Sequence, residues 1–314
     1  MKANALAEAL GYAFIGPPET EVTGVAYAAK ALGSQLAAVS SYQELSEVQS
    51  GILLMEPMAC LVSIPKMVTH ESLELSMVRV AEALIAAGDC PDYRLPSELT
   101  ACAGGAAVGR QVQIGVGCHL GYGAIIEDGA VLGDGCRIGA HTVIHRGVCL
   151  ASGVSVGCGS EIGAPAFFRY RRDGHWRLFG GIGTVRVDEE ASIGSQVIIQ
   201  RGAFSDTRIG AHTLIGSQVE LAHDVEIGQD CVMVSQTGVA SDAVLEDEVT
   251  VFGRTGISNR VRIGRKATVL AHSGVAKDVP SHWCVSGDYS MKHTEHLRLL
   301  AQMRMLLNKK KERR

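Results

Sequence analysis

The sequence predicts a mainly β protein built around a parallel β-helix, and three observations support this prediction. Aliphatic residues recur at every sixth position over Val108–Ile162, Val187–Ile199 and Ile209–Val275. Gly directly follows 12 of these 25 positions, whereas residues 1–100 and 281–314 lack the period altogether. A period of six matches neither an α-helix nor a single strand, and it is typical of hexapeptide-repeat solenoids.

The hexapeptide period also predicts the geometry of the solenoid. Three sides of six residues make one coil of 18, and the repeated aliphatic side chain of each side points into the prism. We expect the Gly that follows to occupy a corner with positive φ, where other residues are strained. The pattern gives about eight coils, and strand spacing makes such a rod about 40 Å long.

Residues 1–100 are predicted to form a separate α/β domain. A short helix should end at Gly11, and strands are expected at Ile52–Met55 and Cys60–Val62. A longer helix should end at Gly88, because its apolar residues fall on one face. These residues are Leu73, Met77, Val80 and Leu84. Residues 92–104 are expected to be a linker to the β-helix over 101–280.

Two insertions interrupt the hexapeptide period. Residues 164–183 contain five of the chain's 15 aromatic residues and four arginines, among them Phe168, Tyr170 and Trp176. Such a loop can stack on a sugar or base and hold phosphate oxygens. The alternative is a lid that packs on a neighbouring subunit. The second insertion adds four residues within Arg201–Thr207.

Residues 281–314 are predicted to form a helical extension over Ser290–Lys309. One stripe of this helix is formed by His296, Leu300, Met303 and Leu307, and it needs a partner to bury it. The terminal Lys309–Arg314 segment is basic, which suits either a solvated end or contact with an acidic partner.

Composition excludes several functions. A net charge of −4 gives no reason to expect nucleic-acid binding. No apolar run is long enough for a transmembrane segment, and Met1–Asn4 does not open a signal peptide, so a cytoplasmic location is expected. Nine cysteines without a CxxC motif suit a reducing compartment. Cys118 and Cys136, 18 residues apart, should stack on adjacent coils as small core or corner residues.

The histidines raise two possibilities. His141 with His145, or His212 with His223, suggest a metal site between subunits, but no convincing trio can be assembled and no metal is predicted. His223 follows the inward Leu221 by two positions and should face out at a corner, where an imidazole can take a proton from an attacking amine. Asp224 either orients this ring or is exposed. The backbone near Ser241, 18 residues on, can stabilise an oxyanion.

Five segments, taken in order, resemble the UDP-3-O-acylglucosamine N-acyltransferases of lipid A biosynthesis, a family of hexapeptide-repeat acyltransferases. They are Glu21–Ala26, the 164–183 insertion, Ile199–Thr207, Ala222–His223 and Val285–Asp288. The resemblance implies a left-handed β-helix, a homotrimer and an enzyme without a cofactor. It further implies that His223 deprotonates the 2-amine of a UDP-3-O-acylglucosamine, which attacks a 3-hydroxyacyl thioester on acyl carrier protein.

The resemblance also assigns binding residues. Six residues are expected to contact the substrate, namely Tyr42, Phe168, Tyr170, Trp176, Arg201 and Asp206. Five basic residues of the late coils are expected to dock the acidic carrier or to be merely solvated, namely Arg254, Arg260, Arg262, Arg265 and Lys266.

Several positions depart from the pattern of this family. Ala37 and Ser40 stand where the family's uracil pocket has Phe and Asn, and Gln200 replaces an Asp. Ser241 replaces the Gly of the oxyanion amide, and Arg260 replaces a His. The alternatives are an N- or O-acyltransferase or acetyltransferase that acts on another sugar nucleotide, with acyl carrier protein or coenzyme A as donor, and a catalytically silent β-helical binding scaffold. The O-acyltransferase of the preceding step is disfavoured, because that enzyme lacks the extra N-terminal domain. Acyl chain length is not predicted.

Overall fold

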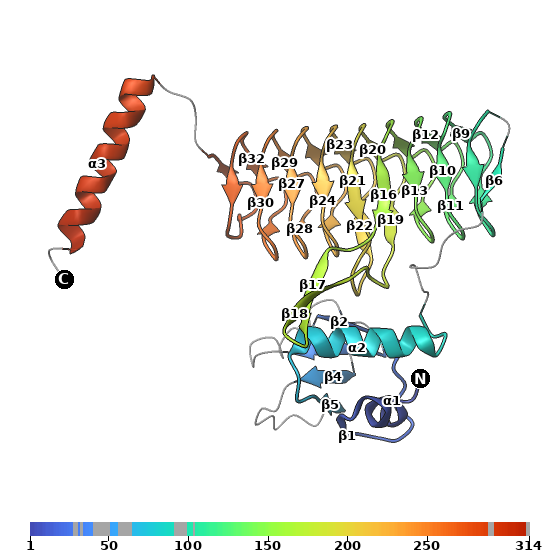
Figure 1. Ribbon diagram of the computed structural model, residues 1–314. Coiled ribbons are helices and arrows are strands. Elements are labelled where there is room, and N and C mark those ends of the chain that lie inside the picture. The colour runs from blue at the N-terminus through green and yellow to red at the C-terminus, as the bar shows by residue number, and fades with distance from the viewer. Residues whose placement is uncertain are drawn as a thin grey trace.

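The computed structural model describes residues 1–27, 31, 34–39, 51–55, 65–90, 99–102, 104–287 and 292–311. An N-terminal α/β domain lies beside a long β-helix, and a hairpin connects the two (Figure 1). A C-terminal helix follows the last coil. This arrangement confirms the predicted fold class.

The N-terminal domain is a five-stranded sheet with the strand order β1-β5-β4-β3-β2, in which only β1 is antiparallel to its neighbour. Its elements are α1 (Ala3–Leu10), β1 (Ala13–Ile15), β2 (Gly24–Tyr27), β3 (Gln35–Val39), β4 (Ile52–Met55), β5 (Lys66–Val68) and α2 (Leu73–Ala86). Gly11 ends α1 at φ +72°, and the Ser72 hydroxyl caps α2 by accepting from Leu75 N. Both predicted helices and the strand at Ile52–Met55 are confirmed. Cys60–Val62 lies outside the described residues.

Within the described residues, the β-helix has three faces of ten, eight and nine strands. The outermost strand of the first face is antiparallel and is not part of a coil, so the other 26 strands make between eight and nine coils, close to the eight that the pattern predicts. The first face contains β6 (Thr100–Ala101), β7 (Ala107–Val108), β10 (Ile125–Ile126), β13 (Val143–Ile144), β16 (Glu161–Ala164), β21 (Ile198–Gln200), β24 (Glu220–Leu221), β27 (Gly238–Val239), β30 (Gly256–Ile257) and β33 (Gly274–Val275). The second face contains β8 (Gln113–Ile114), β11 (Val131–Leu132), β14 (Cys149–Leu150), β19 (Val185–Val187), β22 (Thr207–Ile209), β25 (Glu226–Ile227), β28 (Val244–Leu245) and β31 (Arg262–Ile263). The third face contains β9 (His119–Leu120), β12 (Arg137–Ile138), β15 (Ser155–Val156), β20 (Ser192–Ile193), β23 (Leu214–Ile215), β26 (Val232–Met233), β29 (Thr250–Val251), β32 (Thr268–Val269) and β34 (Cys284–Val285).

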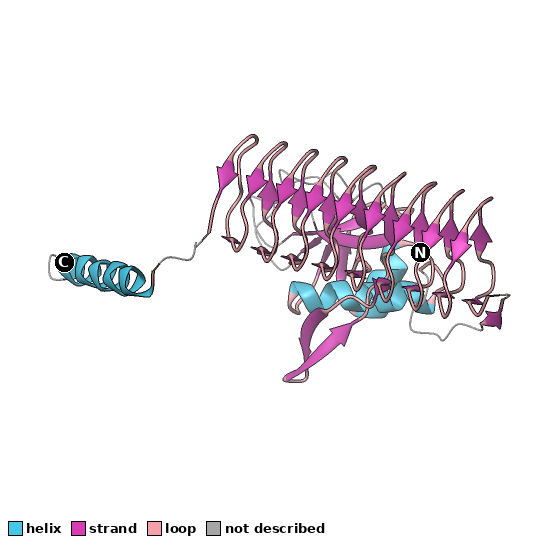
Figure 2. Cartoon of the chain, turned by 90° about the horizontal axis from the view of Figure 1, so that it is seen from above, coloured by secondary structure: helices cyan, strands magenta, loops and turns pink. Residues whose placement is uncertain are grey.

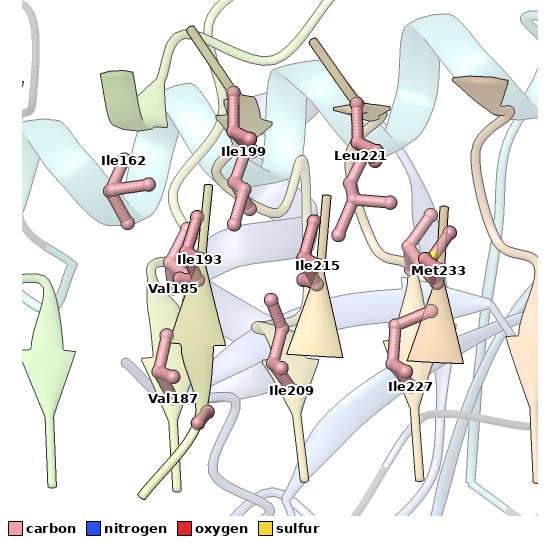
Figure 3. Close-up of a cluster of buried hydrophobic side chains, with 14 of the residues drawn as sticks. Ile162, Val185, Val187, Ile193, Ile199, Ile209, Ile215, Leu221, Ile227 and Met233 are labelled. Atoms are coloured by element: carbon pink, nitrogen blue, oxygen red, sulfur yellow. The ribbon is translucent and has the colours of Figure 1, made fainter. Parts of the chain in front are cut away.

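The repeated aliphatic residues fill the interior of the prism. Figure 3 shows them as columns that converge from the three faces, for example Ile199 and Leu221 from one face and Ile209 and Ile227 from another. Apart from the strands at the two ends of the rod, each strand pairs in parallel with those of the coils before and after it. The first coil is the exception, since Ile114 is 42% exposed where no earlier coil covers it.

The glycine of the repeat serves a different purpose from the one predicted. Gly121 does not have a positive φ; a Cβ there would lie 2.5 Å from Ala140 N in the next coil. The positive φ occurs two residues later, as at Gly123 (+68°), His141 (+56°) and Asp224 (+60°). Where the repeat has Gly, as at Gly121, the residue permits the close approach of two backbones, and the left-handed corner two residues later accepts Gly or a polar residue such as Asp, Gln or His.

The segment between the domain and the β-helix is partly ordered as strand, contrary to the linker prediction. Thr100–Ala101 (β6) pairs antiparallel with β7 and so extends the first face. Cys118 and Cys136 stack on adjacent coils as expected, and both are free thiols whose Sγ atoms donate to backbone carbonyls. Burial raises the pKa of Cys136 to about 11.

The 164–183 insertion forms a β-hairpin of β17 (Phe168–Arg172) and β18 (His175–Phe179), the pair of long strands that projects from the rod in Figure 2. Its inward face joins the core of the N-terminal domain through Phe168, Tyr170 and Phe179. Arg172 also forms an ion pair with Glu82 of α2, at 3.8 Å. The hairpin thus fixes the domain against the β-helix.

The C-terminal helix α3 (His293–Lys311) confirms the predicted helical extension. Leu300 and Met303 of the predicted stripe are 42% and 52% exposed, so nothing described covers that part of it. Of the helices within the described ranges, none combines the length and apolarity that crossing a bilayer requires.

Candidate active site

A cleft of about 910 Å³ lies where the N-terminal domain, the hairpin and the β-helix meet. The domain contributes Tyr27, Ser72 and Glu74, and the hairpin segment contributes Phe167–Arg171 and Trp176. The β-helix contributes corner residues of three successive coils and the strands beside them. These are Gln200, Glu220, Ala222, His223, Ala240, Ser241, Asp242, Asn259 and Arg260.

His223 and Asp224 form a buried pair in the wall of this cleft. The His223 Nδ1 atom lies 2.7 Å from Asp224 Oδ2, and the two side chains are only 8% and 3% exposed. The Phe168 ring and the imidazole pack in a T-shaped arrangement, with ring centroids 5.8 Å apart. The ring is therefore fixed on one side by a carboxylate and on another by an aromatic residue.

Both oxygens of the Asp224 carboxylate accept hydrogen bonds from this chain. The carboxylate accepts hydrogen bonds from the backbone N–H groups of Ala203, Phe204 and Ser205 and from the Ser205 hydroxyl. Burial raises the pKa of Asp224, but the hydrogen bonds from His223 and Ser205 and the charge on His223 outweigh burial and hold the pKa below its ordinary value. Asp224 is thus ionised and orients the ring, and the alternative of an exposed carboxylate is wrong.

This pairing sets the chemistry that His223 can perform. An ionised Asp224 accepts the Nδ1–H of the ring, which leaves the Nε2 lone pair available as a base. Asp224 takes the left-handed corner, with φ +60°, and its own N–H donates to the Thr207 hydroxyl. The four extra residues within Arg201–Thr207 supply the three N–H groups that bind the carboxylate. The second insertion therefore supplies the backbone donors that hold the Asp224 carboxylate in place.

Ser241 lies one coil above His223, as the 18-residue spacing predicts. Asp242 N donates to His223 O at 3.2 Å, and Ala240 and Ser241 line the cleft. Within the described ranges, the Ser241 N–H has no hydrogen-bond acceptor. Ser241 is thus a residue of the cleft wall, one coil from His223, whose N–H can donate to a bound molecule.

Of the six predicted substrate contacts, three line the cleft. Phe168 and Tyr170 are buried in its wall, and Trp176 is 59% exposed. Tyr42 and Ser40 lie outside the described residues, and Ala37 is buried in β3 with no exposed surface.

Arg201 and Asp206 do not line the cleft, which corrects the prediction that they contact substrate. Arg201 is 3% exposed, and its guanidinium donates to the carbonyls of Gly163 and Arg146, at 3.1 and 3.0 Å. Asp206 accepts from Thr184 N and pairs with Arg186 at 2.6 Å. Both side chains satisfy backbone groups where the hairpin leaves and rejoins the coil.

The five basic residues of the late coils divide into two groups. Only Arg260 lines the cleft, with its guanidinium 4.7 Å from the centre of the Tyr27 ring. Burial, followed by the charge of Asp242, raises the pKa of Tyr27 to about 12, so this ring stays neutral. Arg262 pairs with Glu246, Arg265 and Lys266 pair with Glu248, and Arg254 donates to Gln236. Carboxylates of the same chain thus reduce the net positive charge of that surface.

Several cleft residues are not among those that the sequence predicts. Asn259 lies two coils after His223, so the 18-residue period could have found it. Tyr27 and Glu74 carry no such signal, because only the packing of the domain brings them to the β-helix. Of the histidines considered for a metal, His145 lies between Glu127 and Glu161, His212 pairs with Glu190, and His141 packs against the Tyr122 ring.

Together, the fold and the cleft define a hexapeptide-repeat β-helix protein with a buried His–Asp pair. A scan of known family models finds no match. Over 68 residues the chain is 38% identical to a UDP-3-O-acylglucosamine N-acyltransferase of Pseudomonas putida and 37% identical to one of Pseudomonas entomophila. Each match covers 22% of this chain and 19% of the relative, so the chain aligns with about a fifth of the length of these proteins.

Among solved structures, the chain is similar to the UDP-N-acetylglucosamine acyltransferase of Bacteroides fragilis. The TM-score is 0.52 at 19% identity, over 63% of this chain and 76% of that one. This likeness shows the fold, a left-handed parallel β-helix, and confirms the predicted hand. The resemblance to lipid A acyltransferases indicated by the sequence motifs is confirmed as a similarity.

Proposed function

We propose that the chain is an acyltransferase that transfers a 3-hydroxyacyl group from a thioester to the 2-amine of a UDP-3-O-acylglucosamine-type sugar, with His223 as general base. The observation that carries the proposal is the His223–Asp224 pair, held in a cleft beside the Ser241 N–H. The names of the matched relatives supply the substrate class.

The proposed reaction follows from this geometry. The sugar amine attacks the thioester carbonyl while His223 Nε2 takes a proton from the nitrogen. The carbonyl oxygen becomes an oxyanion, and the Ser241 N–H donates a hydrogen bond to it. The intermediate collapses to an amide as the C–S bond breaks, and the His223 imidazolium returns its proton to the leaving thiolate. Every step uses groups of this chain, so we propose no cofactor.

We further propose that acyl carrier protein is the donor and that the protein works as a homotrimer in the cytoplasm. Exposed apolar side chains on and beside the third face, such as Leu214, Val234 and Phe252, support self-association. The eight described cysteines are all free thiols, which suits a reducing compartment. Sedimentation equilibrium should give three times the monomer mass, and a monomer at assay concentration contradicts the trimer.

The test is an assay of the purified protein with UDP-3-O-acylglucosamine and 3-hydroxyacyl thioesters of carrier protein or coenzyme A. We expect turnover with the carrier thioester, and His223→Ala should lower it by roughly 10²- to 10⁴-fold with the fold retained. Unchanged turnover in that variant rejects the base. Turnover with neither donor favours the silent scaffold.

Ala37 favours one second candidate, an acyltransferase that uses another sugar nucleotide. Its side chain is buried within the domain and cannot frame a base in the way that the resemblance implies. A panel of amino-sugar nucleotides in the same assay separates the two candidates.

A further inference from the structure

The charges that line the cleft are segregated by wall. The carboxylates come from the domain and the β-helix, namely Glu74, Glu220 and Asp242. Two of the three arginines, Arg169 and Arg171, come from the hairpin. The third, Arg260, stacks on Tyr27 and lies at the same corner as Asp242, one coil further along the rod. The β-helix wall thus contains two carboxylates and one guanidinium. The cleft is therefore positive at the hairpin and negative at the β-helix.

The outward face of the hairpin concentrates aromatic and cationic groups. Arg169 pairs across the strands with Leu178, and Arg171 with Trp176. The Arg171 guanidinium lies 4.7 Å from the centre of the Trp176 ring, and that of Arg169 lies 5.9 Å from it. In the described part of the chain neither arginine forms an ion pair with a carboxylate, whereas Arg172 pairs with Glu82 on the opposite side.

Large apolar side chains that are exposed together on a folded protein commonly mark a binding surface. Trp176 and Leu178 are 59% and 61% exposed, while the inward face of the same hairpin is buried. An indole with guanidinium groups beside it presents a flat surface for a base and donors for phosphate oxygens.

We infer that the outward face of the hairpin binds the nucleoside diphosphate of the acceptor, with the base against Trp176 and the diphosphate on Arg169 and Arg171. This inference rests on the proposed function and extends it. It places the nucleotide on the hairpin rather than on strand β3, where Ala37 offers no exposed surface.

The segregated charges also orient the acceptor. A sugar nucleotide is anionic at its diphosphate and carries a basic amine on the sugar. The hairpin attracts the diphosphate, and Glu220 and Asp242 attract the amine toward the wall that contains His223. The polarity of the cleft therefore directs the amine toward His223.

Tryptophan fluorescence tests the inference without any turnover. The chain has two tryptophans, so Trp283→Phe leaves Trp176 as the only tryptophan that emits. We titrate this variant with UDP, with uridine, which lacks phosphate, and with phosphopantetheine, which has phosphate but no base. UDP should quench or shift the emission and bind at least roughly tenfold more tightly than either of the others, because both contacts contribute.

Two further variants of the same protein give the matched comparison. Arg171→Gln should weaken UDP binding roughly tenfold, by loss of a charge-assisted contact, and Arg172→Gln should leave it unchanged. Thermal unfolding confirms that both variants are folded. Equal UDP affinity in all three proteins, or a response to phosphopantetheine alone, overturns the inference. Either result leaves the His223 assay unaffected, so the failure of one proposal is distinct from the failure of the other.

Discussion

Oδ2 of Asp224 lies 2.7 Å from Nδ1 of His223, the residue directly before it in the chain. Neighbouring residues on a strand point to opposite sides, and only the left-handed backbone at Asp224 turns both side chains toward the same corner. The base and the group that orients it are thus produced by one corner of one coil.

Asp224→Asn should lower kcat by roughly 10²- to 10⁴-fold. The Asn amide can donate to Nδ1, which favours the neutral tautomer with its proton on Nε2, and that nitrogen then cannot act as a base. The measurement is kcat with the donor that proves active, together with urea unfolding, since the carboxylate also binds three backbone N–H groups. In the His223→Ala background the same change should have almost no further effect on kcat. A full additional loss there would show that Asp224 acts independently of the ring.

Phe204→Ala should weaken the packing of the hairpin against the rest of the molecule. Phe204 lies edge-on to Phe168, with ring centroids 4.9 Å apart, and stacks on Phe179 at 5.4 Å. Removal of this buried ring should cost about 3–5 kcal/mol of unfolding free energy. Phe167→Ala is the control, because that ring is 59% exposed and should change stability by less than about 0.5 kcal/mol. Similar losses in both variants would contradict the role given to Phe204.

Gly121→Ala should destabilise the β-helix by about 1–3 kcal/mol, since the added Cβ meets the backbone of the next coil 2.5 Å away. Gly238→Ala provides the comparison, because no atom lies within 4 Å of its added Cβ. Chemical denaturation of the two variants measures the difference. A neutral Gly121→Ala would argue against close backbone approach as the reason for the repeat glycine.

His145 should make stability depend on pH. Burial lowers the pKa of His145, but the hydrogen bonds that its ring forms to Glu127 and Glu161 outweigh burial and raise the pKa overall. The hydrogen bond from His145 lowers the pKa of Glu127. A raised histidine pKa stabilises the fold below the unfolded pKa, and this contribution is lost as pH rises through the folded pKa.

Urea unfolding near pH 6 and near pH 9 tests this, with the wild type losing more stability over that range than His145→Gln. The lowered pKa of Glu127 acts in the opposite direction, and its contribution is lost as pH falls through its folded pKa. An equal change of unfolding free energy with pH in both proteins would mean that the hydrogen bonds of His145 to Glu127 and Glu161 do not stabilise the coils.

The sequence by itself determined the solenoid. A six-residue period specifies which side chain of each side points inward, and the coil then repeats because every strand pairs with an equivalent one 18 residues away. For this reason His223 and Ser241 could be placed one above the other before any coordinates were known, and the hairpin could be recognised as an interruption.

Only the tertiary structure decided what surrounds the imidazole. Burial of Asp224 depends on three N–H groups from an insertion about 20 residues earlier in the chain, and Tyr27 reaches the cleft only because the N-terminal domain packs on the hairpin. Arg201 is a second example. Its place in a family-like motif predicted a substrate contact, but its guanidinium donates to backbone carbonyls instead. Periodicity describes contacts between equivalent positions, whereas the cleft is made by contacts between unlike parts of the chain, and no local pattern encodes those.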